Sequence, residues 1–137
     1  MQFFSKKGFA RYQKATGGTD WKRLWTDYRA HLDSIRHLLS PAWQQLAEAD
    51  FHDHKILSIQ QPSKREFVMV LEAASLRFSG VRFVWIPKTA VGDRWVYWEV
   101  TPSDDGGVDL EICLAHDEIR IIADDVEIQS HRHSTVC

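Results

Sequence analysis

The sequence predicts an α+β domain in which N-terminal helices pack on an antiparallel β meander of five to six strands. Apolar residues follow a helical spacing from Trp21 to Leu39, and the spacing changes to alternation after Asp50. The alternating segments are joined by turns too short to contain a crossover helix. Parallel neighbours need such a crossover, so the short turns predict antiparallel pairing throughout.

The bulk composition is that of one ordinary globular domain. We expect a single domain over residues 1–137, helical over about 1–49, an antiparallel sheet over 50–128 and a disordered tail over 129–137. The net charge of −2 makes nucleic acid an unfavoured partner. We expect no membrane segment, because no apolar run is long enough, and two cysteines make no disulfide framework. The sequence therefore favours a cytoplasmic protein.

The helical third contains two predicted helices. TGGTD makes a turn in which Thr19 or Asp20 caps a helix that continues to about Leu39. Ser40 caps a second helix, which starts at Pro41. The first helix carries an apolar stripe that we expect to cover one face of the sheet. The stripe consists of Trp21, Leu24, Trp25, Tyr28, Leu32, Ile35, Leu38 and Leu39.

Alternation in the second half predicts which side chains share a face of the sheet. In GVRFVWIP it places Val81, Phe83 and Trp85 on one face. In DRWVYWEV it places Trp95 and Tyr97 together. EFVMVLEAA is apolar on both faces and indicates a central strand. The Asp-Gly-Gly sequence in SDDGGVDLEICLA is typical of a hairpin turn.

Three segments occur in order: WKRLWTDYRAHLDSIRHLLS, FHDHKILSIQQPSKREFVMVL and VGDRWVYWEVTPSDDGGVDLEICLAHDEIRIIADDVEI. Together they resemble a family of small bacterial proteins of unknown function, with a Trp-rich helix, a Phe-His-Asp strand start and an acidic hairpin. The resemblance covers about residues 21–128. It implies a fold and no mechanism. A weaker analogy is to bacterial immunity proteins with similar strand starts, which bind and block one cognate toxin.

The stretch FHDH raises the question of a metal site. On a strand, His52 and His54 share a face and could bind zinc with His116 as a further ligand. In the structural interpretation, Asp53 caps the preceding turn while His52 packs its ring and bonds a carbonyl. We favour the structural interpretation and expect no cofactor, because no complete ligand set is visible. A contact between His31 and Asp53 would be a buried polar tie between helix and strand, or a general base held by a carboxylate, and polar ties are the commoner of the two.

Two other side chains could carry chemistry. Glu99 lies among aromatic residues, and we expect it to pair with Arg94 or Arg82 across the sheet rather than to act as an acid. Cys113 alternates with acidic residues, which raise a thiol pKa and disfavour a nucleophile. The sequence names no reaction. It favours a non-enzymatic protein and keeps a metal-dependent enzyme or sensor at His52 and His54 as the alternative.

The last third is rich in carboxylates. A solvated sheet face is the simpler interpretation. The functional interpretation is a surface for a basic protein partner, since complementary charge speeds capture. By analogy with immunity proteins, we expect an inhibitor that holds a basic toxin through the acidic hairpin and exposed aromatic residues. The expected contact residues are Asp104, Asp105, Asp109, Glu111, Trp95 and Trp98.

Overall fold

The computed structural model describes residues 3–4, 10–14 and 17–131 and shows the predicted α+β class. The helix α2 (Trp21–Ile35) is continued by a short 3-10 helix, η1 (Arg36–Leu38), and is followed by α3 (Pro41–Glu48). The strands are β1 (Ile56–Ser63), β2 (Glu66–Leu71), β3 (Ala74–Trp85), β4 (Trp95–Pro102), β5 (Val108–Leu114) and β6 (Glu118–Ser130).

Both helices begin at the predicted capping residues. The Asp20 side chain accepts a hydrogen bond of 3.3 Å from the backbone N–H of Arg23. Ser40 Oγ accepts one of 3.4 Å from Trp43 N–H, and Pro41 is the first residue of α3. These bonds satisfy N–H groups that have no partner inside the helix.

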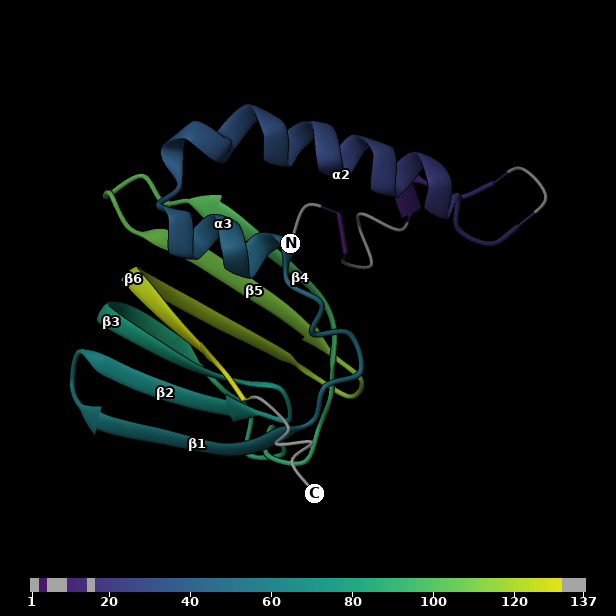
Figure 1. Cartoon of the computed structure of the whole chain (residues 1–137). Helices are drawn as coiled ribbons and strands as arrows, with labels where there is room; N and C mark the ends of the chain where they lie inside the picture. The colour runs from purple at the N-terminus through teal and green to yellow at the C-terminus, as the bar shows by residue number, and fades with distance from the viewer. Residues whose placement is uncertain (1–2, 5–9, 15–16, 132–137) are drawn as a thin grey trace, which may run out of the picture.

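The strands form one antiparallel sheet in the order β1-β2-β3-β6-β5-β4 (Figure 1). Two three-stranded meanders, β1–β2–β3 and β4–β5–β6, are joined by the pairing of β3 with β6. Pairing of Ala74 with Ser130 extends β6 beyond Ile128, where the sequence predicts the sheet to end. Residues 132–137 of the expected tail lie outside the described residues.

The long strands β3 and β6 curve together, so that each runs through both halves of the sheet (Figure 1). Gly80 has φ 61° and faces Asp124, whose side chain occupies the space of a Cβ at that position. A bulge follows between Val81 and Phe83. Bulges bend a strand and increase its twist, which explains the curvature at this corner.

The two edge strands of the sheet meet at one end. Residues 53–56 and 92–95 exchange backbone hydrogen bonds with donor–acceptor distances of 2.7–3.1 Å. Lys55 and Arg94 form an antiparallel bridge within this contact. The sheet therefore curls into a partly closed barrel, which leaves fewer unpaired strand edges.

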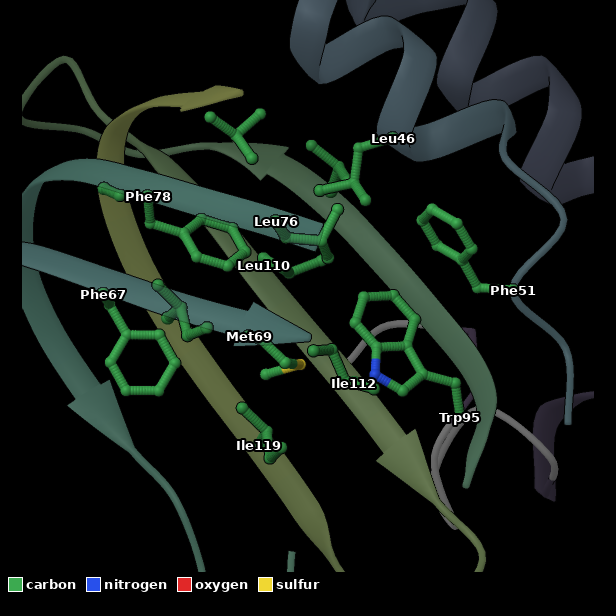
Figure 2. Packing of buried hydrophobic residues seen from close by; sticks show 14 of the residues in the cluster. Leu46, Phe51, Phe67, Met69, Leu76, Phe78, Trp95, Leu110, Ile112 and Ile119 are labelled. Atoms are coloured by element: carbon green, nitrogen blue, oxygen red, sulfur yellow. The ribbon is translucent and has the colours of Figure 1, made fainter. Parts of the chain in front are cut away.

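The main hydrophobic core fills the interior of this barrel. α3 packs on β6 and β4 and closes the open side. Figure 2 shows Leu46 of α3 pointing toward Leu76 and Leu110, above Met69 and Trp95. The indole N–H of Trp43 adds a hydrogen bond of 3.3 Å to the carbonyl oxygen of Asp124, which fixes α3 to β6.

The long helix α2 does not cover a face of the sheet, as its apolar stripe predicts, but lies beside edge strand β4. The segment Phe3–Phe4 occupies the space between α2 and β4, so the helix buries its stripe on this segment. Trp21 and Trp25 remain 40% exposed. The second core cluster consists of Phe3, Phe4, Tyr12, Leu24, Tyr28 and Leu32.

Substitution of Gly80 tests the corner between β3 and β6. Gly80→Ala should lower the free energy of unfolding by about 2–4 kcal/mol, because it adds backbone strain and a clash with Asp124. Gly106→Ala is the control, since Gly106 has φ 95° but open space around it, and should lose only about 1–2 kcal/mol. Urea unfolding measures both. Equal losses would show that the approach of Asp124 does not constrain the corner.

Candidate functional site

A cleft of about 820 Å³ lies between α2, residues 47–52 and residues 96–98 of β4. The segment 47–52 contains the end of α3 and most of its connection to β1. Clefts of this size that are lined by aromatic groups are typical of binding sites. The aromatic residues that line it are Phe4, Trp21, Trp25, Tyr28, Tyr97 and Trp98.

The rings of the cleft are held by one another and by hydrogen bonds. Tyr97 stacks on Phe4 with ring centroids 4.7 Å apart and on Trp21 at 5.5 Å. The Tyr28 hydroxyl donates to the carbonyl oxygen of Trp98 at 3.2 Å. Burial raises the pKa of Tyr28, and the Glu99 carboxylate raises it further, so this hydroxyl keeps its proton at neutral pH.

A bulge at the start of β4 decides which of its rings reach the cleft. The register shifts between Trp95 and Tyr97, so these two rings lie on opposite faces and not on one face as alternation predicts. Trp95 is fully buried in the barrel, and this removes it as a partner contact. Trp98 lines the cleft and donates its indole N–H to the carbonyl oxygen of Leu46 at 3.0 Å.

The same kind of shift occurs in β3. A bulge between Val81 and Phe83 turns Phe83 and Trp85 away from the barrel, although alternation predicts all three on one face. Val81 is buried, whereas Trp85 is 60% exposed. The guanidinium of Arg120 lies 5.7 Å from the centre of the Phe83 ring. Phe83 and Trp85 therefore form a second exposed aromatic site, apart from the cleft.

Charged groups line the cleft beside the rings. Arg36 lies 3.1 Å from the Asp33 carboxylate and 2.5 Å from that of Glu48, so its pairs join the end of α2 to α3. Within the described part of the chain, Arg29 and Asp50 also line the cleft but form no ion pair. Both are exposed.

The stretch FHDH forms a turn rather than the start of a strand. His54 N–H donates to the carbonyl oxygen of Phe51 at 3.0 Å, and Asp53 has φ 64°, a conformation that Asp tolerates better than most residues. His52 Nδ1 lies 2.9 Å from the carbonyl oxygen of Val96 on β4. The predicted bond from His52 to a carbonyl is therefore present, and it covers an acceptor on the sheet edge.

The turn does not place the predicted metal ligands on one strand face. His52 lies 3.4 Å from Asp53, whereas His116 pairs with Asp93 on another turn. Among the residues that the structure describes, no three His, Cys, Asp or Glu side chains gather so that they could hold a metal ion. A buried Nδ1 with no hydrogen-bond partner remains on His54.

The predicted polar tie between His31 and Asp53 does not form. The ring of His31 packs on Phe3 at 5.4 Å, and Asp53 is next to His52. Because α2 lies outside the barrel beside β4, His31 faces the N-terminal segment instead of the turn. α2 is tied to β4 by the bond from Tyr28 to Trp98 and by the stacking of Trp21 on Tyr97.

Asp93 is a buried carboxylate that sequence reasoning missed. It accepts hydrogen bonds from the backbone N–H groups of Arg94 and His116, at 2.8 and 3.1 Å, and its Oδ1 lies 3.1 Å from His116 Nδ1. Burial alone would raise the pKa of Asp93, but these bonds outweigh it and hold the pKa below its ordinary value. The one sequence signal is the Gly-Asp pair that begins GDRW.

Glu99 does not pair with Arg94 or Arg82 as predicted. Its side chain is buried, with 5% exposure, and Oε1 accepts backbone N–H groups from Phe3 and Phe4, both at 2.6 Å. In the register of β4 and β5 it stands opposite Glu111, which itself stands opposite Arg120. Glu99 therefore anchors the segment that forms one wall of the cleft.

The thiol of Cys113 is half-buried on the outer face of β5. Burial raises its pKa, and the carboxylates of Glu118 and Asp93 raise it further. The predicted direction is confirmed. A raised pKa keeps the thiol protonated at neutral pH, which disfavours its use as a nucleophile.

Part of the acidic hairpin's charge is already balanced within the chain. Arg120 binds both oxygens of Asp109, at 3.1 and 2.7 Å. The Asp105 carboxylate lies 3.5 Å from Arg82, which also donates to the Asp105 carbonyl oxygen at 2.6 Å. Asp104 is exposed. The hairpin therefore supports the fold as well as presenting charge.

Removal of the Glu99 carboxylate tests its role as an anchor. Glu99→Ala should lower the free energy of unfolding by about 1–3 kcal/mol, because two buried N–H groups lose their acceptor. It should also speed hydrogen exchange of α2 amides, since Phe3 and Phe4 hold that helix. Exposed Glu118→Ala is the control. Unchanged α2 exchange in Glu99→Ala would contradict the anchoring role.

Asp93 makes stability depend on pH in a defined direction. Because its folded-state pKa is lowered, its contribution is fully present above the unfolded-state pKa of about 3.9 and is lost as the pH falls through the folded value. Asp93→Asn should cost about 1–3 kcal/mol at pH 7 and progressively less below about pH 4. Urea midpoints measure this, with exposed Asp104→Asn as control. A loss of stability in Asp93→Asn that does not change with pH would contradict this role of the Asp93 carboxylate.

The arrangement is suited to binding. The cleft offers rings, a few hydrogen-bonding groups and charges on both sides, and His52 is already engaged with a carbonyl.

No helix within the described residues has the length and apolar character needed to cross a membrane. No protein-family model matches the chain, and a search of curated proteins finds no match.

Proposed function

We propose that this chain is a non-enzymatic protein-binding module and that its partner binds in the aromatic cleft beside β4. The observation that carries the proposal is the exposure of Trp21 and Trp25, 40% each, at the edge of a cleft lined by further aromatic rings. Large aromatic side chains in concave sites supply most of the energy in protein interfaces. Their retention on the surface is otherwise unfavourable.

The cleft is favoured over the acidic hairpin as the centre of the interface. Asp109 is paired with Arg120, and Trp95 is buried, so these two residues serve the fold. Exposed Asp104 remains available at a hairpin turn. Charges at such positions act mainly on the association rate, so the hairpin would steer a basic partner that the cleft then holds.

An inhibitor or immunity role fits this proposal. Such a protein needs a stable scaffold and one binding surface, and it needs no reacting groups of its own. The resemblance to small bacterial proteins and the analogy to immunity proteins stay predictions. The analogy agrees with a basic toxin as the partner, since Asp104 of the acidic hairpin is exposed.

Substitution of Trp25 tests the proposal. The partner is captured from the native host on the immobilised full chain, identified and purified, and its Kd is measured by calorimetry. Trp25→Ala should weaken binding by about 30-fold or more, because it removes an aromatic anchor. Trp85→Ala is the matched control, since Trp85 is 60% exposed on another surface, and should change the Kd less than about threefold.

Both variants are first shown to be folded by circular dichroism and thermal unfolding. A partner whose Kd is unchanged in Trp25→Ala would contradict the cleft as the binding site. Loss of partner binding in Trp85→Ala would instead assign the binding site to the outer face of β3.

A further inference from the structure

We propose that the cleft receives a peptide segment of the partner protein in which an apolar or aromatic anchor is flanked by one acidic and one basic side chain. The acidic side chain pairs with Arg29, and the basic side chain pairs with Asp50. This inference rests on the proposed function and adds the chemical character and orientation of the bound segment.

The charges that line the cleft are only partly paired with one another. Arg36 is held by Asp33 and Glu48 at 3.1 and 2.5 Å, so its positive charge is already engaged by two carboxylates. Within the described residues, Arg29 and Asp50 line the same cleft with no ion pair. A ligand that displaces water from them gains most if it brings the opposite charge to each.

Arg29 and Asp50 belong to different elements of the cleft. Arg29 lies one helical turn beyond Trp25 on α2, so a group that stacks on Trp25 has the guanidinium beside it. Asp50 lies on the other wall, just after the end of α3. The carbonyl end of a helix carries a partial negative charge, which adds to the attraction of Asp50 for a cation.

The separation of Arg29 from Asp50 gives the cleft a direction. Arg29 belongs to α2 and Asp50 belongs to the segment after α3. On β4, Tyr97 stacks on Trp21 of α2 and Trp98 bonds to Leu46 of α3, so the rings of β4 contact both elements. A segment with its charges reversed would meet like charges on both walls. Like-charge contacts are costly at an interface, so the cleft selects one direction of the segment.

The experiment uses a displayed library of random linear peptides selected on the full chain. Peptides that bind the wild type but not Trp25→Ala are sequenced, and the Kd of one such peptide is measured. The inference expects an acidic and a basic residue on either side of an apolar anchor. Arg29→Glu and Asp50→Lys should each weaken this peptide about tenfold. Lys88→Glu, an exposed cation outside the cleft, should change the Kd less than about twofold.

Restoration of binding is the decisive measurement. A peptide with its two charges exchanged should bind the double variant Arg29→Glu/Asp50→Lys within about threefold of the original affinity and bind the wild type poorly. Peptides that require Trp25 but ignore both charge variants would overturn this inference and leave the proposed function standing.

Three other outcomes would contradict the proposed function or the identity of the occupant. If no selected peptide depends on Trp25, the proposed function fails at this cleft. If the chain self-associates in sedimentation and Trp25→Ala abolishes this, the occupant is a second copy of the chain and not a partner segment. Binding of an uncharged detergent with the same dependence on Trp25, and no charge-bearing peptide, would assign the cleft to an apolar small molecule.

Discussion

The backbone hydrogen bonds between residues 53–56 and 92–95 are the contact on which the other features depend. They bring the start of β1 to the start of β4 and convert an open sheet into a partly closed barrel. The same contact fixes the turn at His52, whose ring covers a carbonyl group on β4. The barrel closure and the turn beside the cleft are thus held by neighbouring bonds between the start of β1 and the start of β4. A barrel with a joined edge also offers fewer sites for unwanted strand pairing.

The sequence predicts the class, the helix starts and the change of period because each of these depends on residues close in the chain. Asp20 and Ser40 cap helices through bonds to residues three positions later. The bulges in β3 and β4 cannot be predicted in this way. A bulge adds one residue opposite a single partner, so every later side chain changes face while the sequence pattern continues. The bulge in β3 separates Val81 from Phe83, and the one in β4 separates Trp95 from Tyr97.

The position of α2 is a second feature that the sequence does not predict. Helical spacing identifies a buried stripe but does not say what buries it. Here the partner is the Phe3–Phe4 segment, which is 95 or more residues from the carboxylate of Glu99 that anchors it. Trp98 is a cleft residue that the sequence also proposed. The sequence around Arg29 and Asp50 does not mark them as binding residues. Their role in binding depends on which neighbouring charges are already paired in the folded chain.

The curved pair of β3 and β6 also has a consequence for the order of synthesis. β3 is complete when residue 85 has been made, but its partner β6 begins only at Glu118 and is the last strand among the residues that the structure describes. A nascent chain that has left the ribosome up to β5 therefore carries a long strand edge with its partner still missing. Such edges pair readily with other chains, so the free edge of β3 is open to unwanted pairing during translation. The vulnerable interval ends when β6 is released and the two meanders join.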